Sequence, residues 1–374
     1  MARTIHRGSM WLIVLLTGLL GAPSLIAADT LPREISDDAF WRMISDFSEK
    51  GGSFRFEYMS NEREYQFVIP ELKKITKPGG AYLGVGPEQN FTYIAASRPK
   101  IAFIFDIRRD NMIEHLMYKA IFEMSTDRRD FISRLFSRKA PSGLTERATV
   151  KALFEAYSGR DGDQELFNQN LQAIKNHLMK NHGFQLTGND QASIGYIYQT
   201  FFDAGPGFHY LGGNFEGGAY ADLMSATDRQ GQAQSYLASE ESFQFVREME
   251  TKNLIIPLLG DFGGVKAIRS VGRYLKDRGA VVTTFYTSNV EQYLFQQSED
   301  WRDFYGNVAT LPLDSSSTFI RSSHFAYTNG AQRPYRQVGG GNFLSLLCPM
   351  MDLVKAFAMG RIAAYDDVIR MSKD

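Results

Sequence analysis

The chain has 374 residues, a formal net charge of −1 and 44% hydrophobic residues. This composition is typical of a folded globular protein and excludes a disordered or collagenous chain. A single cysteine, Cys348, excludes an intrachain disulfide and cysteine-ligated zinc or iron–sulfur sites. The near-neutral charge lacks the basic excess of nucleic-acid-binding proteins, so we expect no nucleic-acid partner.

The first 28 residues differ from the rest of the chain. They carry two arginines and no acidic residue, an apolar run over Met10–Leu20 and small residues up to Ala28. This order is typical of a secretory signal peptide and predicts export to the periplasm or the extracellular space. The alternative is an uncleaved membrane anchor over residues 10–28, because the run is nearly long enough to span a bilayer. Residues 29–374 would form the globular part.

Hydrophobic periodicity and turn signals predict the elements of the first half of the chain. Helices are expected over residues 37–49, 62–74 with a kink at Pro70, 89–97 and 111–124, and strands over 81–85 and 100–105. The order of strand, helix, strand and helix indicates parallel strands joined by helical crossovers.

Residues 125–200 carry a helical pattern and predict a helical insertion without a strand. The glycine-rich stretch from Gly205 to Gly218 predicts a loop with one or two short strands, placed over a ligand or serving as a plain surface connection. Further strands are expected over 254–259, 281–286, 308–311 and 318–321, and a helix over 264–278. We therefore predict an α/β fold with a doubly wound, mostly parallel Rossmann-like sheet and a helical insertion.

The sharpest local feature is a strand that runs into a glycine turn and then a helix. Gly84 and Gly86 form the turn, and Asp106 follows twenty positions after Gly86, at the end of the next strand. Glycines let the backbone approach a cofactor, and a carboxylate at the second strand end can accept ribose hydroxyls. The alternative is a tight turn with Asp106 as a helix N-cap. A dinucleotide site is less favoured, because Gln89 occupies the place of its third glycine.

This segment resembles the cofactor-binding half of Rossmann-type S-adenosylmethionine-dependent methyltransferases. It is also similar to a family of uncharacterised bacterial proteins considered methyltransferase-like by fold. Gly84 and Gly86 match the first two glycines of the family turn, and Asp106 matches its ribose-binding acid. Tyr82 stands where the family has an acid, and Glu88 where it has a third glycine. The resemblance implies S-adenosylmethionine as cofactor, bound at Gly84, Gly86, Glu88 and Asp106.

Polar residues that follow later predicted strands are candidates for a substrate site. They are Asp261, Tyr286, Ser288, Asn289 and Glu291. At the carboxyl edge of a parallel sheet such side chains could orient a small molecule. Asn61 and Glu62 precede a predicted helix, and the resemblance adds them, because in methyltransferase-like folds the segment before the first strand can close over the cofactor. The alternative for each is helix capping.

Other chemistries find little support. His177 and His182 are five apart, whereas the zinc helix motif has its histidines four apart on one face, so no metal site is predicted. Two hypotheses remain. The first is an exported methyltransferase-like protein that binds S-adenosylmethionine or a related nucleoside. The second is a non-enzymatic exported protein that binds a small molecule or a surface partner, and it is favoured by export to a compartment where that cofactor is not expected.

Overall fold

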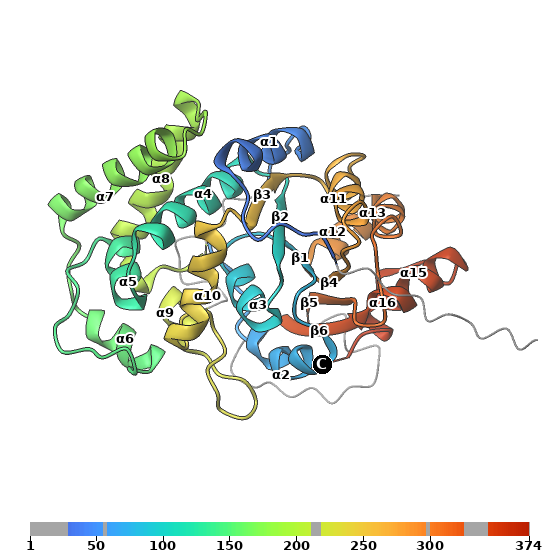
Figure 1. Ribbon diagram of the computed structural model, residues 1–374. Coiled ribbons are helices and arrows are strands. Elements are labelled where there is room, and N and C mark those ends of the chain that lie inside the picture. The colour runs from blue at the N-terminus through green and yellow to red at the C-terminus, as the bar shows by residue number, and fades with distance from the viewer. Residues whose placement is uncertain (1–28, 55–57, 211–217, 297–299, 325–342, 374) are drawn as a thin grey trace, which may run out of the picture.

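A computed structural model describes residues 29–54, 58–210, 218–296, 300–324 and 343–373 (Figure 1). The expected leader over residues 1–28 lies outside these ranges. Within them, no helix has the length and hydropathy that crossing a bilayer requires. The described residues form an α/β fold around one six-stranded sheet, with strands in the order β3-β2-β1-β4-β5-β6.

The sheet is parallel except at one edge. Its strands are β1 (Ala81–Val85), β2 (Ile101–Asp106), β3 (Ile255–Leu259), β4 (Val282–Ser288), β5 (Thr318–His324) and β6 (Phe343–Pro349). Strand β6 pairs with β5 in antiparallel orientation, whereas the other neighbours are parallel. Every residue of β1 and β2 is buried, which explains their unbroken apolar sequence, because a parallel strand is usually covered on both faces.

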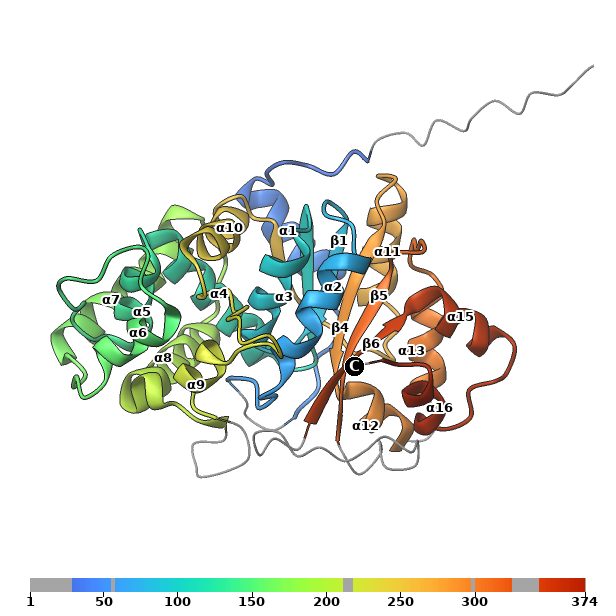
Figure 2. The same ribbon diagram turned by 90° about the horizontal axis from the view of Figure 1, so that it is seen from below.

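Helices surround the sheet (Figures 1 and 2). They are α1 (Asp37–Phe47), α2 (Ile69–Ile75), α3 (Gln89–Ser97), α4 (Arg109–Met124), α5 (Arg128–Phe136), α6 (Val150–Tyr157), α7 (Gln164–Asn176), α8 (Gly188–Ala204), α9 (Tyr220–Ser225), α10 (Glu240–Thr251), α11 (Ala267–Lys276), α12 (Val290–Gln296), α13 (Asp300–Val308), α15 (Met350–Ala358) and α16 (Tyr365–Arg370). Shorter turns are the 3₁₀ helices η1 (Tyr65–Val68) and η3 (Gly205–Gly207) and the π-helix η2 (His177–Asn181).

The helices pack in two series. One runs from α1 through α11 and α13 to α15, and the other from α2 through α3 and α10 to α4. Residues 125–200 contain α5, α6, α7, η2 and most of α8, with no strand among them. In both views α5 to α8 lie together at one side of the molecule, and α15 and α16 lie at the opposite side (Figures 1 and 2).

Two expectations about the elements are wrong, and one strand was not predicted. Residues 62–74 do not form one helix: η1 precedes α2, and Pro70 lies in the first turn of α2, where its missing N–H costs nothing. The strand expected over 308–311 is absent, because Trp301, Phe304 and Val308 bury one face of α13, which ends at that point. Strand β6 was not predicted, and it closes the described sheet in antiparallel orientation.

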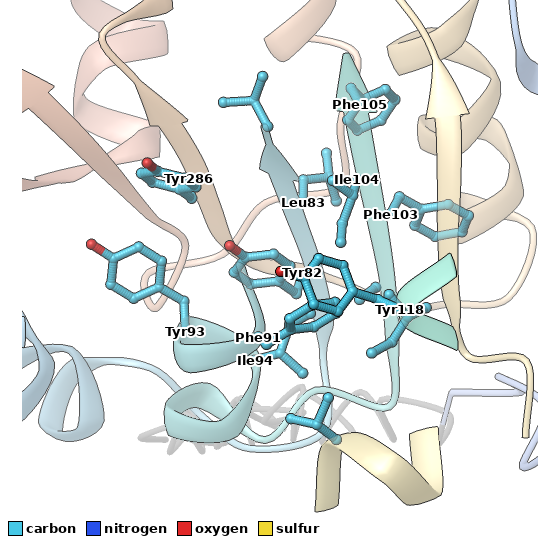
Figure 3. Packing of buried hydrophobic residues seen from close by; sticks show 14 of the residues in the cluster. Tyr82, Leu83, Phe91, Tyr93, Ile94, Phe103, Ile104, Phe105, Tyr118 and Tyr286 are labelled. Atoms are coloured by element: carbon cyan, nitrogen blue, oxygen red, sulfur yellow. The ribbon is translucent and has the colours of Figure 1, made fainter. Parts of the chain in front are cut away.

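The core beneath the sheet edge is rich in aromatic rings. Phe91 of α3 packs edge to face against Tyr118 of α4, with ring centroids 5.3 Å apart. Tyr93 of the same helix lies beside Tyr286 of β4, at 5.0 Å between centroids (Figure 3). All four side chains are buried. Large buried rings with fixed contacts give a rigid support for residues at the ends of β1 and β4.

Candidate functional site

A pocket of about 510 Å³ lies at the edge of the sheet where β1, β2, β3 and β4 end. From β1 the sheet order continues to β2 and β3 on one side and to β4 and β5 on the other. The pocket therefore lies where the strand order reverses, which is the usual ligand position in open α/β sheets. Because β6 is antiparallel, Phe343 at its amino end lies on the same edge and also lines the pocket.

The structure brings most of the predicted site residues together around this pocket. Those that line it are Asn61, Glu62, Gly86, Asp106, Asp261, Tyr286, Ser288 and Asn289. Three do not: Gly84, Glu88 and Glu291 are absent from the lining and have other roles, described below.

The glycine turn presents Gly86 to the pocket. Gly86 has a φ of +76°, and a Cβ added there would meet nothing within 4 Å. The Asn90 side-chain amide lies 2.7 Å from the carbonyl oxygen of Pro87 and 3.0 Å from that of Gly86. Nε2 of His115 is 2.8 Å from the same Gly86 oxygen. Asn90 and His115 thus fix the carbonyls of the turn by hydrogen bonds. The open side of Gly86 allows a ligand to approach the backbone closely.

Gly84 serves packing beneath the turn. A Cβ at Gly84 would lie 1.9 Å from Oδ1 of Asn90 and 2.8 Å from the Tyr82 hydroxyl. That hydroxyl donates to the same Oδ1 at 2.9 Å. Tyr82 and Asn90 fill the space in front of Gly84, so its lack of a side chain serves packing, and its predicted contact with a cofactor stays a prediction.

Glu88 is also turned away from the pocket. Its side chain is fully buried, and both carboxylate oxygens lie 3.1 Å from the backbone nitrogen of Ser60, which donates to them. Burial raises the pKa of Glu88 to about 8, although the backbone hydrogen bond from Ser60 lowers it. Glu88 therefore ties the segment before η1 to the start of α3 and lies outside the pocket lining.

Asp106 lies at the tip of β2 and is paired with Arg108. Oδ1 of Asp106 accepts from the Arg108 backbone N–H at 2.8 Å and from its Nε at 3.0 Å, and Oδ2 accepts from its NH2 group at 2.8 Å. Asp106 is not the cap of α4, whose N-cap position is occupied by Arg108. A carboxylate offers about four acceptor sites, so these three bonds leave one on Oδ2 for a ligand.

Glu62 is a second buried acid at the pocket, beside Asp106. Its Oε1 accepts from the Tyr286 hydroxyl at 2.9 Å and from the Ser288 hydroxyl at 2.6 Å, and its Oε2 accepts from the Gln89 amide at 2.8 Å. Burial raises the pKa of Glu62, and the hydrogen bonds from Ser288, Gln89 and Tyr286 oppose that rise. Ser288 has a φ of +49°, an unusual conformation for a residue with a side chain, and such positions cluster at functional sites.

Glu291, predicted as a substrate residue, is a structural one. It is fully buried and pairs with Arg321 of β5, with Nε of Arg321 2.7 Å from Oε2. The hydroxyls of Thr287 and Tyr305 also donate to its carboxylate, at 3.1 and 2.7 Å. These three side chains use the carboxylate inside the core, and Glu291 is absent from the pocket lining.

The charges around the pocket favour a neutral or cationic ligand. Among the described lining residues the acids are Glu62, Asp106, Asp261 and Asp300, and Arg108 is the basic one. Proteins usually bind phosphate with cationic side chains. Arg108 is already paired with Asp106, so the described lining residues do not favour a phosphate group.

Residues 58–197 and 218–350 match a family described as a domain of unknown function, DUF7790. The chain belongs to the DUF7790 family. No curated protein matches it. The matched segments of the DUF7790 domain contain Glu62, Gly86, Asp106 and Ser288, so the pocket is built mainly from the family domain.

Aromatic residues also line the pocket of this DUF7790 protein. They are Phe54, Tyr210 and Tyr293, and the rings of Phe54 and Tyr293 meet edge to face with centroids 5.4 Å apart. Tyr210 lies in the stretch from Gly205 to Gly218, for which a loop over a ligand is one of the two predictions. Sequence reasoning missed the other two. Tyr293 could have been found, because it lies about one helical turn after Asn289 in the helix predicted to start there. Phe54 belongs to no motif, and only the tertiary structure places it at the pocket.

The structure brings His177 and His182 together although their spacing departs from that of the zinc helix motif. The zinc-motif spacing assumes an α-helix, whereas η2 is a π-helix that starts at His177. It brings the rings to 4.9 Å between centroids, and both histidines approach Glu123.

Proposed function

We propose that this DUF7790 protein binds a nucleoside ligand of the S-adenosylmethionine class in the pocket between Gly86 and Asp106. The observation that carries the proposal is the convergence of an open glycine turn and a strand-end carboxylate on one pocket at the reversal of strand order. We also infer that the sheet is a doubly wound, Rossmann-type sheet, since its order is the order of that fold with an antiparallel edge strand.

The residues present fit the nucleoside part of such a ligand. Gly86 faces open space at the pocket, so a ligand can approach its backbone closely, and Asp106 retains an acceptor for a ribose hydroxyl. The buried carboxyl of Glu62 suits the cationic end of the ligand, because a positive charge in the pocket would favour its ionised form. When bound, S-adenosylmethionine would supply an activated methyl group.

The proposal covers ligand binding and names no methyl acceptor. Tyr286 and Ser288 both donate to Glu62, and burial raises the pKa of Tyr286 well above its usual value. These hydrogen bonds orient Glu62 at the pocket. They leave the lone pairs of both hydroxyl oxygens free, so the proposal rests on ligand binding alone.

Thermal unfolding of the purified chain tests the proposal. At ten times the dissociation constant, S-adenosylmethionine should add about 1.4 kcal/mol to the free energy of unfolding and raise Tm by about 2 °C. Its demethylated product lacks the sulfonium charge and should bind more weakly, and Glu62→Gln should reduce that difference. The absence of any shift at millimolar concentration of both compounds would rule the ligand class out.

Export stays a proposal of its own. If residues 1–28 are a leader, the protein recovered from the periplasm or medium begins at or near residue 29, and amino-terminal sequencing would show it. Recovery of the intact amino terminus in the membrane fraction would instead support the anchor.

A further inference from the structure

A second polar cluster lies away from the pocket, where the end of α4 meets the end of α7. Oε2 of Glu123 lies 2.5 Å from Nε2 of His177 and 2.6 Å from Nε2 of His182. The three ligand atoms lie within 4.8 Å of one another. The side chains of Glu123, His177 and His182 are 7%, 19% and 12% exposed, so solvent reaches a largely shielded cluster.

The π-helix η2 creates this arrangement. The backbone N–H of His182 donates to the carbonyl of His177 at 3.1 Å, and this hydrogen bond joins residues five positions apart. Residues five apart therefore lie one above the other, as residues four apart do in an α-helix. Single π-turns are rare and are frequently found at functional sites.

Groups around the cluster fix the two rings. Nδ1 of His182 lies 2.6 Å from Oδ1 of Asp37, and its ring stacks on Phe184 at 5.0 Å between centroids. Nδ1 of His177 lies 3.1 Å from Nδ2 of Asn181, and when Nε2 binds a metal this amide turns so that its Oδ1 accepts from Nδ1. A histidine that binds a metal through one nitrogen almost always has its other nitrogen hydrogen-bonded, often to a carboxylate. The pair of His182 and Asp37 has this form.

The hydrogen-bond partners of His182 call for a positive charge between it and Glu123. Both of its ring nitrogens face a carboxylate, from Asp37 and Glu123. A neutral imidazole that donates from Nδ1 has only a lone pair at Nε2, and this lone pair would face the lone pairs of Oε2. A cation held by Nε2 and Oε2 removes that conflict, as does a second ring proton. Lys119 does not fill this role, because its Nζ lies on the other oxygen, 2.7 Å from Oε1.

We propose that Glu123, His177 and His182 form a site for a divalent transition-metal ion of the Zn²⁺ class. Two imidazoles and one carboxylate are a donor set that Zn²⁺ accepts, with a fourth position left to water. At metal–ligand distances of about 2.0–2.1 Å, the three donor atoms would separate to about 3.3 Å in a tetrahedral site. The ion would link α4, which packs on the sheet, to the end of α7 in the helical segment.

Metal binding to the full chain tests the site directly. After treatment with a chelator and desalting, the protein should take up one equivalent of Zn²⁺, measured by competition with a chromophoric chelator. Co²⁺ should give the visible absorption of a tetrahedral nitrogen and oxygen site. His177→Gln and His182→Gln should each weaken Zn²⁺ binding at least 100-fold, and Asp37→Asn should weaken it about 10- to 100-fold.

The matched control is His209→Gln, a histidine outside the cluster, which should bind Zn²⁺ like the wild type. Circular dichroism shows whether each variant folds, and the Co²⁺ spectrum of the wild-type chain does not depend on any variant. A wild type without a stoichiometric Zn²⁺ or Co²⁺ site would overturn the proposal and leave a protonated His182 between two carboxylates. Equal Zn²⁺ uptake by His182→Gln and wild type would overturn it as well.

Discussion

Arg108 holds both carboxylate oxygens of Asp106 while Asp106 lines the pocket, so the proposed ribose acid is fixed in place before any ligand binds. Pre-organisation of this kind lowers the cost of ordering a side chain on binding. It also leaves a single free acceptor on Oδ2, so Asp106 can accept one further hydrogen bond from a ligand. The effect of that one hydrogen bond on ligand affinity can be measured.

Asp106→Asn should remove the preference of the pocket for ribose hydroxyls. We expect the wild type to bind adenosine about tenfold more tightly than 2′,3′-dideoxyadenosine, which is the effect of one hydrogen bond of about 1.4 kcal/mol to a charged group. Calorimetric titration of both nucleosides measures the ratio. In Asp106→Asn the ratio should fall toward one, and in Asp261→Asn, which changes another acid of the same pocket, it should be unchanged. An unchanged ratio in Asp106→Asn would place the ribose elsewhere.

The two glycines of the turn should respond differently to alanine. Gly84→Ala drives a Cβ to within 1.9 Å of Asn90 and should cost about 3 kcal/mol of stability in urea unfolding. Gly86→Ala meets no neighbouring atom and carries only the strain of its positive φ, about 1–2 kcal/mol, but should weaken adenosine binding at least tenfold. Equal losses of stability in the two variants would contradict this division of roles.

The buried pair of Glu291 and Arg321 should dominate the stability of the second half of the sheet. Neither side chain is exposed, so Arg321→Met leaves a carboxylate without its counter-charge and should cost about 3–5 kcal/mol. The double variant Glu291→Gln with Arg321→Met removes both charges and should recover part of that loss. Urea unfolding of the single and double variants gives the comparison. A double variant no more stable than Arg321→Met would mean that the charge on Glu291 is not what destabilises the single variant.

Stability should fall on the alkaline side because of Glu88. Its pKa is raised from 4.5 to about 8, so the folded state keeps a proton that the unfolded chain releases over that interval. The protonated Glu88 therefore contributes its full stability below pH 4.5, and this contribution is lost as the pH rises to about 8. Glu88→Gln should remove about 1–2 kcal/mol of the decline between about pH 6.5 and pH 9.

Two other buried groups, Glu250 and His115, also affect how the stability of the fold depends on pH. Burial raises the pKa of Glu250 to about 8 as well, so the variant should flatten the profile only in part. Burial lowers the pKa of His115 to about 4, which destabilises the fold on the acid side below the usual histidine range and leaves the alkaline side unaffected. The exposed Glu34→Gln is the control and should keep the wild-type profile. A profile of Glu88→Gln identical to this control would contradict the prediction.

The local pattern of the sequence determined the elements that build the pocket edge. The apolar runs of β1 and β2 and the stripe of α4 follow from backbone hydrogen bonding and burial, which act over a few residues and leave a period in the sequence. Gly86 and Asp106 could be placed on one edge for the same reason, because parallel neighbouring strands bring their carboxyl ends together.

Only the tertiary structure decided which side chains meet across the chain. Glu62 lies 224 residues from Tyr286, Glu291 lies 30 residues from Arg321, and His182 lies 59 residues from Glu123. Each contact depends on how separate elements pack, and packing leaves no period in the sequence. The sequence therefore determined the type of fold and the edge at which to look, whereas the fold itself decided which predicted residues face the pocket and which are buried beneath it.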